Sequence, residues 1–300
     1  MTNEKCQMTN GKSLFRLLLV LVLLLSALAA PGQSRKRSGS HARPVRESLS
    51  VEDREVVERA IGTVCSQRVQ DPKGSAPIDD MQKRPSLPLH DPDVVNGIAR
   101  AQQLLPIARD LVAASLRQLA TTYQVTRIAS YEARMSRAIA RVQAVKRIRP
   151  DMDARDNASV YMKNPRTITF GTIFLAGLPS DEGMISVLAH ELVHIADGDA
   201  DSLQPLFRVI GVRASNLTSL RVRGQRAEEL TCDLIGGLAV QSFIAQSPNY
   251  EPLPRRLARS LEHNCVDEDD SDEEHLSPRN TIRALLVLDA ALRRQLVYGK

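Results

Sequence analysis

The sequence has 300 residues, of which 43% are hydrophobic and 25% are charged, and its net charge is +5. These values are those of an ordinary globular protein with room for one sizeable domain and additional segments. The basic excess lies largely between Arg35 and Arg46 without any nucleic-acid recognition motif, so we expect no nucleic-acid partner.

The N-terminus has the pattern of an export signal. Lys12 and Arg16 precede an apolar run over residues 17–25, and small residues follow it. Ala27 and Ala29 fit the cleavage positions, so we predict a signal peptide over residues 1–29 and an exported protein, periplasmic or extracellular. An uncleaved anchor is the alternative, and it would bring membrane association through the N-terminal segment.

A basic, Pro-rich linker is predicted over residues 30–90, with a short helix from Val51 to Val64, and a compact domain over residues 91–300. Removal of the signal peptide would leave Cys65, Cys232 and Cys265, an odd number without metal-ligand spacing. A disulfide between Cys65 and Cys265 is one option in an oxidising compartment, and the sequence leaves it open.

Helical spacing of apolar residues runs from Asp91 to Val145, and Pro106 is predicted to kink or split this stretch. The period then changes between Ala158 and Leu175, where the turn signal Asn164-Pro165 separates two apolar runs. We therefore expect a hairpin of two short strands there.

The remaining elements are predicted to be helices and loops. Ser180 should cap a helix that ends near Ala196, and another helix should run from Gln225 to Ala245. The acidic residues 267–274 indicate a solvated loop, and a closing helix is expected over Thr281–Val297. Aromatic residues make up only 3% of the chain, so the core must be mainly aliphatic. The fold class is α+β, mainly helical.

The segment His190-Glu191-Leu192-Val193-His194 matches the pattern H-E-x-x-H. Residues four apart lie on one face of a helix, so both imidazoles can reach one metal ion. Glu191 is offset by about 100 degrees, which leaves its carboxylate free to take a proton from water. We predict one zinc ion per chain on His190 and His194, with Glu191 as the catalytic base.

A catalytic zinc normally has a third protein ligand. The metzincin extension is excluded, because Asp197 and Ala200 stand where it needs Gly and His. The best candidate is Glu229, which shares a helix face with Asp233. Asp233 could hydrogen-bond the far nitrogen of a metal-bound imidazole. The alternative ligands are a group of carboxylates just after the helix: Asp197, Asp199 and Asp201.

The strand pair, the H-E-x-x-H helix, and Glu229 to Asp233 followed by Gly236 resemble the gluzincin metallopeptidases of the CAAX-prenyl-protease and HtpX type. The resemblance covers about residues 157–285. It implies a zincin-like fold in which a small β-sheet borders the cleft and a second helix supplies the third ligand. Carried over, it implies zinc on His190, His194 and Glu229, with Glu191 as base and Asp233 as the residue that orients an imidazole.

The sequence departs from that family at two places. Cys232 stands where the family usually has Ala, and a thiolate so close to the metal could compete for it. Ser277-Pro278 resembles the family's His-Pro element, with Ser in place of His. The donor that would stabilise the oxyanion stays open among four residues: His263, His275, Arg283 and Tyr298.

The resemblance implies a zinc metalloendopeptidase that hydrolyses peptide bonds in protein or peptide substrates, with a role in protein quality control in the cell envelope. We expect an extended substrate to add as a strand beside Ile168–Phe174. The alternative function is a non-hydrolytic envelope chaperone or assembly scaffold on the same zinc-stabilised fold. Glu191 argues against it, because a purely structural site has no use for a free carboxylate.

Overall fold

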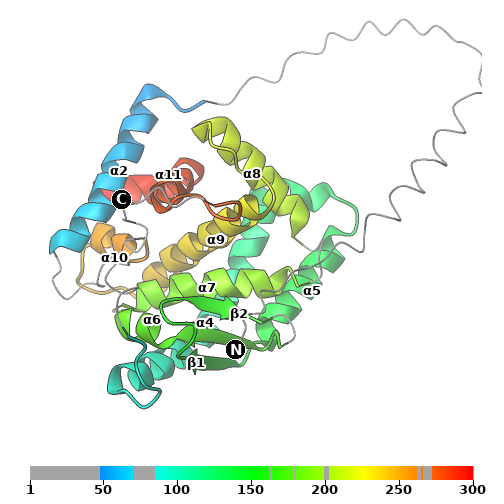
Figure 1. Cartoon of the computed structure of the whole chain (residues 1–300). Helices are drawn as coiled ribbons and strands as arrows, with labels where there is room; N and C mark the ends of the chain where they lie inside the picture. Colours follow the sequence, from blue (N-terminus) through cyan, green and yellow to red (C-terminus); the bar gives the residue numbers. More distant parts are fainter. Residues whose placement is uncertain are drawn as a thin grey trace, which may run out of the picture. The chain divides into compact units, whose positions relative to one another are not determined.

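The computed structural model describes residues 48–70, 85–161, 164–178, 180–198, 203–261, 265 and 272–299 (Figure 1). They belong to one compact unit, residues 46–300, which includes the helix predicted near Val51. The signal segment 1–29 lies outside the described residues.

The described residues are mainly helical with one small sheet, as predicted for an α+β fold. The helices are α2 (Val51–Gln70), α4 (Pro92–Thr122), η1 (Val125–Arg127), α5 (Tyr131–Ala144), α6 (Thr172–Gly177), α7 (Asp181–Ala196), α8 (Gln204–Thr218), α9 (Gln225–Gln246), α10 (Leu253–Arg259), α11 (Pro278–Leu288) and α12 (Ala290–Tyr298). The strands are β1 (Arg147–Asp151), β2 (Ala158–Val160) and β3 (Thr167–Gly171). Within the described residues, no helix is both long and apolar enough to cross a membrane.

The sequence predicts that Pro106 kinks or splits its helix. Helix α4 continues through Pro106, so the split is wrong and the kink stays a prediction. Proline removes one helical hydrogen bond, but Leu104, Leu105 and Ala108 around it are buried in the core. Their burial stabilises the helical path on both sides. The helix begins where Asp91 accepts a hydrogen bond from the amide of Asp93 at 2.9 Å.

The sheet has the strand order β1-β3-β2. Strands β2 and β3 pair antiparallel, which confirms the predicted hairpin, and β1 pairs parallel to β3. The second strand is shorter than predicted. It ends at Gly171, and the chain turns at once into α6, which contains Ile173 and Phe174. Gly171 is needed there because a Cβ atom would lie 1.9 Å from the carbonyl oxygen of Arg155.

The C-terminal segment forms two helices, α11 and α12, and the prediction of one helix over Thr281–Val297 is wrong. The break is at Asp289, whose backbone is extended. Its carboxylate accepts hydrogen bonds from the amides of Ala291 and Leu292 at 3.0 and 2.9 Å. Asp289 therefore caps α12, which is a common reason for a helix to restart.

Helix α2 is longer than predicted and packs against α10, α11 and α12. Its buried residues are Val56, Val57, Ala60, Ile61 and Val64. A disulfide joins Cys65 of α2 to Cys265, as the sequence left open, and the Cα atoms lie 5.4 Å apart. Arg293 of α12 also donates to Asp53 at 2.6 Å.

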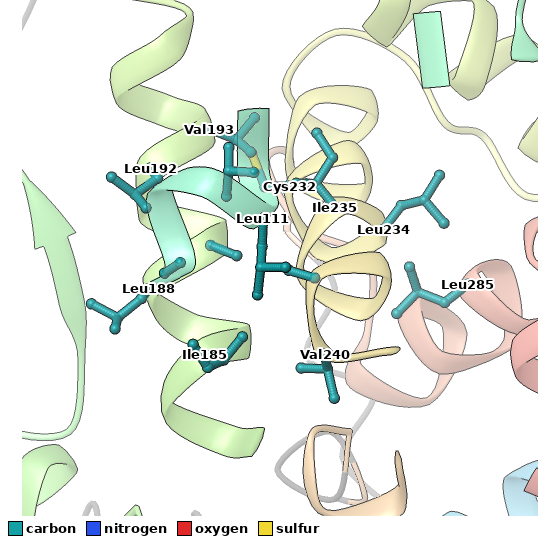
Figure 2. Close-up of a cluster of buried hydrophobic side chains, with 14 of the residues drawn as sticks. Leu111, Ile185, Leu188, Leu192, Val193, Cys232, Leu234, Ile235, Val240 and Leu285 are labelled. Carbon is teal, nitrogen blue, oxygen red and sulfur yellow. The ribbon is translucent and has the colours of Figure 1, made fainter. Parts of the chain in front are cut away.

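The core lies between α4, α7 and α9, which pack against one another. Figure 2 shows its aliphatic side chains, with Leu188 and Leu192 from α7, and Ile235 and Val240 from α9. Cys232 also lies in this cluster (Figure 2) and is fully buried. The two helices that carry the predicted site are therefore held by the main core of the protein.

Candidate metal centre

Helix α7 begins as predicted. The hydroxyl of Ser180 accepts a hydrogen bond from the amide of Gly183 at 3.0 Å, which satisfies one of the free donors at the helix start. The helix is fixed in rotation by a fully buried apolar stripe: Ile185, Leu188, Leu192 and Ile195. Because this stripe faces the core, His190 and His194 are held on one face, with ring centroids 5.0 Å apart.

Helix α9 approaches α7 closely at Gly236. A Cβ atom at this position would lie 3.0 Å from the carbonyl oxygen of Ser186 and 3.2 Å from its hydroxyl. The missing side chain lets the two backbones come near each other. Asp233 and Glu229, about one and two turns before Gly236, can therefore reach across to the histidines of α7.

Three atoms from these helices converge. Nε2 of His190 lies 3.1 Å from Nε2 of His194, and Oε2 of Glu229 lies 3.2 Å from the first and 3.5 Å from the second. Ligand atoms about 2.1 Å from a tetrahedral zinc ion are separated by roughly 3.4 Å. The spacing of the three atoms therefore fits a tetrahedral metal ion.

The other ring nitrogens are held by carboxylates. Oδ1 of Asp233 lies 2.8 Å from Nδ1 of His190, which is the contact expected from the sequence. Oε1 of Glu228 lies 3.2 Å from Nδ1 of His194. The sequence predicts no contact of Glu228 with the metal site, because Glu228 is offset around the helix from Glu229. In the structure Glu228 contacts Nδ1 of His194, whereas Glu229 lies near Nε2 of both histidines.

The carboxylates create a strongly negative environment. Burial opposes protonation of His190, but the bonds from Asp233 and Glu229 outweigh burial and raise its pKa well above the ordinary value. For Glu229, burial is likewise outweighed by the two histidines, which lower its pKa. An environment that stabilises protonated imidazoles would also stabilise a metal cation.

Glu191 lies in the same region and is 7% exposed. Burial raises the pKa of its carboxyl group, and the charges of His190 and His194 partly oppose this rise. A carboxylate with a raised pKa is a better proton acceptor than an ordinary one. Glu191 thus has the property that a general base needs.

The donor set fits a metal ion with nitrogen, oxygen or sulfur ligands. One donor atom each of His190, His194 and Cys232 lies within 4.8 Å of the others, so this group could hold a metal ion. Glu229 is another possible third donor, and its Oε2 lies 3.2 Å from Nε2 of His190 and 3.5 Å from Nε2 of His194. The sulfur of Cys232 lies 3.9 Å from Nδ1 of His194.

His275 is the predicted oxyanion donor that the structure places at this site. Its Nε2 lies 3.9 Å from Oε2 of Glu229, and its ring is about half exposed. The carboxylate of Asp272 lies 3.1 Å from its Nδ1, and Arg226 donates to the carbonyl oxygen of Asp272. Because Nδ1 faces Asp272, Nε2 is the ring nitrogen that is directed at the site, where it can donate to an oxygen.

The other candidate donors have different surroundings. Arg283 pairs with Glu58 of α2 at 3.1 Å, and the hydroxyl of Tyr298 accepts from Arg59 of α2 at 2.7 Å. Both side chains are thus engaged away from the histidine pair. Ser277, at the position of the family's His, is buried at the start of α11. His263 lies outside the described residues.

Of the carboxylates after α7, the structure describes Asp197, which has a role in the fold. Asp197 accepts a hydrogen bond from the amide of Leu203 at 2.7 Å and so fixes the connection to α8. Burial raises the pKa of Asp197 to about 6. Asp199 and Asp201 lie outside the described residues.

The central strand β3 has a neighbour on each side, so it offers no free edge to a substrate. The prediction of a substrate strand beside Ile168–Phe174 is therefore wrong. Strand β2 is the last strand on its side of the described sheet, and it packs against α7. Its outer edge is the one nearest to the helix that carries the histidines.

We expect Asp233→Ala and Glu228→Ala to lower metal affinity by similar factors, about 10- to 100-fold each, because each removes the support of one imidazole. Zinc affinity should be measured by competition with a chromophoric chelator. Arg223→Ala, a change at an exposed position before α9, serves as the control. An effect of Asp233→Ala alone would mean that the contact of Glu228 with His194 does not support the metal.

Comparison with models of known protein families, with curated proteins and with solved structures finds no match to this chain. The geometry of the site is therefore the basis for a proposed function.

Proposed function

We propose that the protein is a zinc-dependent endopeptidase with a zincin-like fold of the gluzincin type. The observation that carries the proposal is the convergence of His190, His194 and Glu229, with pairwise distances of 3.1, 3.2 and 3.5 Å between their donor atoms. The buried carboxylate of Glu191 next to them supplies a group that a purely structural metal site would not need. In this proposal α9 supplies the third ligand.

Each residue of the site has a separate role in the proposed hydrolysis of peptide bonds. When bound, zinc polarises the scissile carbonyl and lowers the pKa of a neighbouring water. Glu191 accepts the proton of the attacking water and transfers it to the leaving amine. His275 donates from Nε2 to the oxygen that becomes negative during the attack. Asp233 and Glu228 keep the two imidazoles in position.

An extended peptide would bind along the outer edge of β2 and continue the sheet beside α7. Main-chain hydrogen bonds would then supply much of the affinity, so the enzyme would show little sequence selectivity. This suits a protease that acts on many unfolded proteins, as in quality control in the cell envelope. The disulfide between Cys65 and Cys265 supports an exported protein, because such bonds persist in oxidising compartments.

The proposal is tested on the purified protein by metal analysis and casein digestion. We expect about one zinc ion per chain and hydrolysis that a chelator abolishes and added zinc restores. Unfolding of the metal-free protein must be excluded as the cause of the lost hydrolysis. Circular dichroism is therefore recorded before and after chelation. Zinc binding without hydrolysis of any unfolded protein would instead favour the envelope scaffold.

A further inference from the structure

The histidine pair belongs to two donor sets. Glu229 completes one of them with an oxygen, whereas Cys232 completes the other with a sulfur. The two residues are three apart on α9, but they approach the histidines differently. The oxygen of Glu229 lies 3.5 Å from Nε2 of His194, while the sulfur of Cys232 lies 3.9 Å from Nδ1 of the same ring.

The sulfur of Cys232 and Nδ1 of His194 are close enough for a single metal ion to bind both. Metal bonds are about 2.3 Å long to sulfur and about 2.1 Å long to imidazole nitrogen. An ion could therefore span the gap of 3.9 Å between sulfur and Nδ1 with an open, nearly trigonal angle. Glu228, at 3.2 Å from the same nitrogen, would lose its hydrogen bond to the ring when the ion binds.

Both apolar and polar groups surround Cys232. The residue is fully buried in a cluster whose other labelled side chains are aliphatic (Figure 2), while its sulfur lies 3.9 Å from Nδ1 of His194. A thiolate at the edge of an apolar core is costly unless a cation neutralises it. A monovalent ion and a thiolate neutralise each other, and a thiolate is the donor that a soft ion prefers.

We propose that Cys232, together with His194 and His190, forms an alternative site for Cu⁺. Soft ions prefer thiolate ligands, while the set with Glu229 suits zinc. Binding forms a copper–sulfur bond and releases the thiol proton to solvent. Because both donor sets also include His190, Cu⁺ competes with zinc for this residue. Copper binding itself does not depend on the proposed peptidase function, and only the resulting inhibition rests on it.

The test uses the full chain with Cys6→Ser, so that Cys232 is the one thiol left besides the disulfide pair. Cu⁺ is titrated anaerobically into the metal-free protein, and the thiolate-to-copper charge-transfer band is followed in the ultraviolet. We expect about one Cu⁺ per chain with this band. Cys232→Ala should abolish the band and weaken Cu⁺ binding by more than about 100-fold, beyond the loss typical of a residue that only supports a ligand.

The two donor sets are separated by matched variants. Cys232→Ala should still bind zinc, Glu229→Gln should bind Cu⁺ but lose zinc, and His194→Ala should lose both ions. Cys232→Ser preserves the volume of the side chain and guards against a folding defect in the Ala variant. Cu⁺ binding without the charge-transfer band, or with equal affinity in Cys232→Ala, would overturn the proposal.

Copper inhibition is measured separately from copper binding. If zinc-loaded protein digests casein, Cu⁺ should inhibit it, and the inhibition should be at least about 100-fold weaker with Cys232→Ala, in line with the loss of copper affinity. If the protein digests nothing, the peptidase proposal fails while the titration still decides the copper site. Equal inhibition of both proteins would show that Cu⁺ acts elsewhere.

Discussion

Replacement of Glu191 by Gln should leave about one zinc ion per chain and reduce peptide hydrolysis by roughly 10²- to 10⁴-fold. The amide is nearly isosteric with the carboxylate but cannot accept the proton of the attacking water. None of the three converging donor atoms belongs to Glu191, so the metal should stay. Zinc content and the rate of casein digestion are measured on the same preparation.

Variants of the proposed ligands provide the contrast. His190→Ala and Glu229→Ala should lose both zinc and hydrolysis, because each removes one of the three converging donor atoms. Circular dichroism shows whether each variant is folded. Full activity of Glu191→Gln would refute the proposed role of this residue, whatever the metal content.

The largest effect on stability is expected at the ion pair between Arg256 and Glu182. Nε of Arg256 donates to Glu182 at 2.6 Å, and Nη1 donates to the carbonyl oxygen of Ser247 at 2.7 Å. The two side chains are only 5% and 6% exposed. Arg256→Ala leaves a buried carboxylate without its partner, which typically costs about 3–5 kcal/mol. The pair joins α10 to the first turn of α7.

Urea denaturation with the disulfide intact measures this loss. The control is Arg259→Ala on the same helix. Arg259 pairs with Glu251 at 2.7 Å, and the side chain of Glu251 is 37% exposed. Such pairs contribute about 0.2–1 kcal/mol. The double variant Glu182→Leu with Arg256→Met should recover most of the stability, because it removes both charges together. Equal losses of unfolding free energy in Arg256→Ala and Arg259→Ala would show that burial does not make the pair of Arg256 and Glu182 more important for stability.

The helices of the site could be predicted because their signals are local. Ser180 caps α7, and the apolar spacing from Ile185 to Ile195 gives both its extent and its buried face. Strand β1 could not be found in the same way. Its buried residue is Ile148, and Pro150 argues against a strand. It is a strand because β3 pairs with it, and a partner distant in sequence leaves no local pattern.

The contact of Glu228 shows the same limit at the site. Helical geometry correctly separates the directions of Glu228 and Glu229, but it does not say what lies in each direction. That depends on how α7 crosses α9 at Gly236. The break at Asp289 had a local signal, since Asp is a favoured residue at a helix start. The apolar pattern of Thr281–Val297 masked it.

The disulfide between Cys65 and Cys265 closes a covalent ring around the residues between them, a sequence separation of 200. The ring contains both α7 and α9, while α11 and α12 follow it in the chain. A single cut of a peptide bond inside the ring, including one that the protein makes in itself, leaves the two fragments joined through sulfur. Such a nicked molecule keeps its mass on a non-reducing gel and separates into two bands only after reduction.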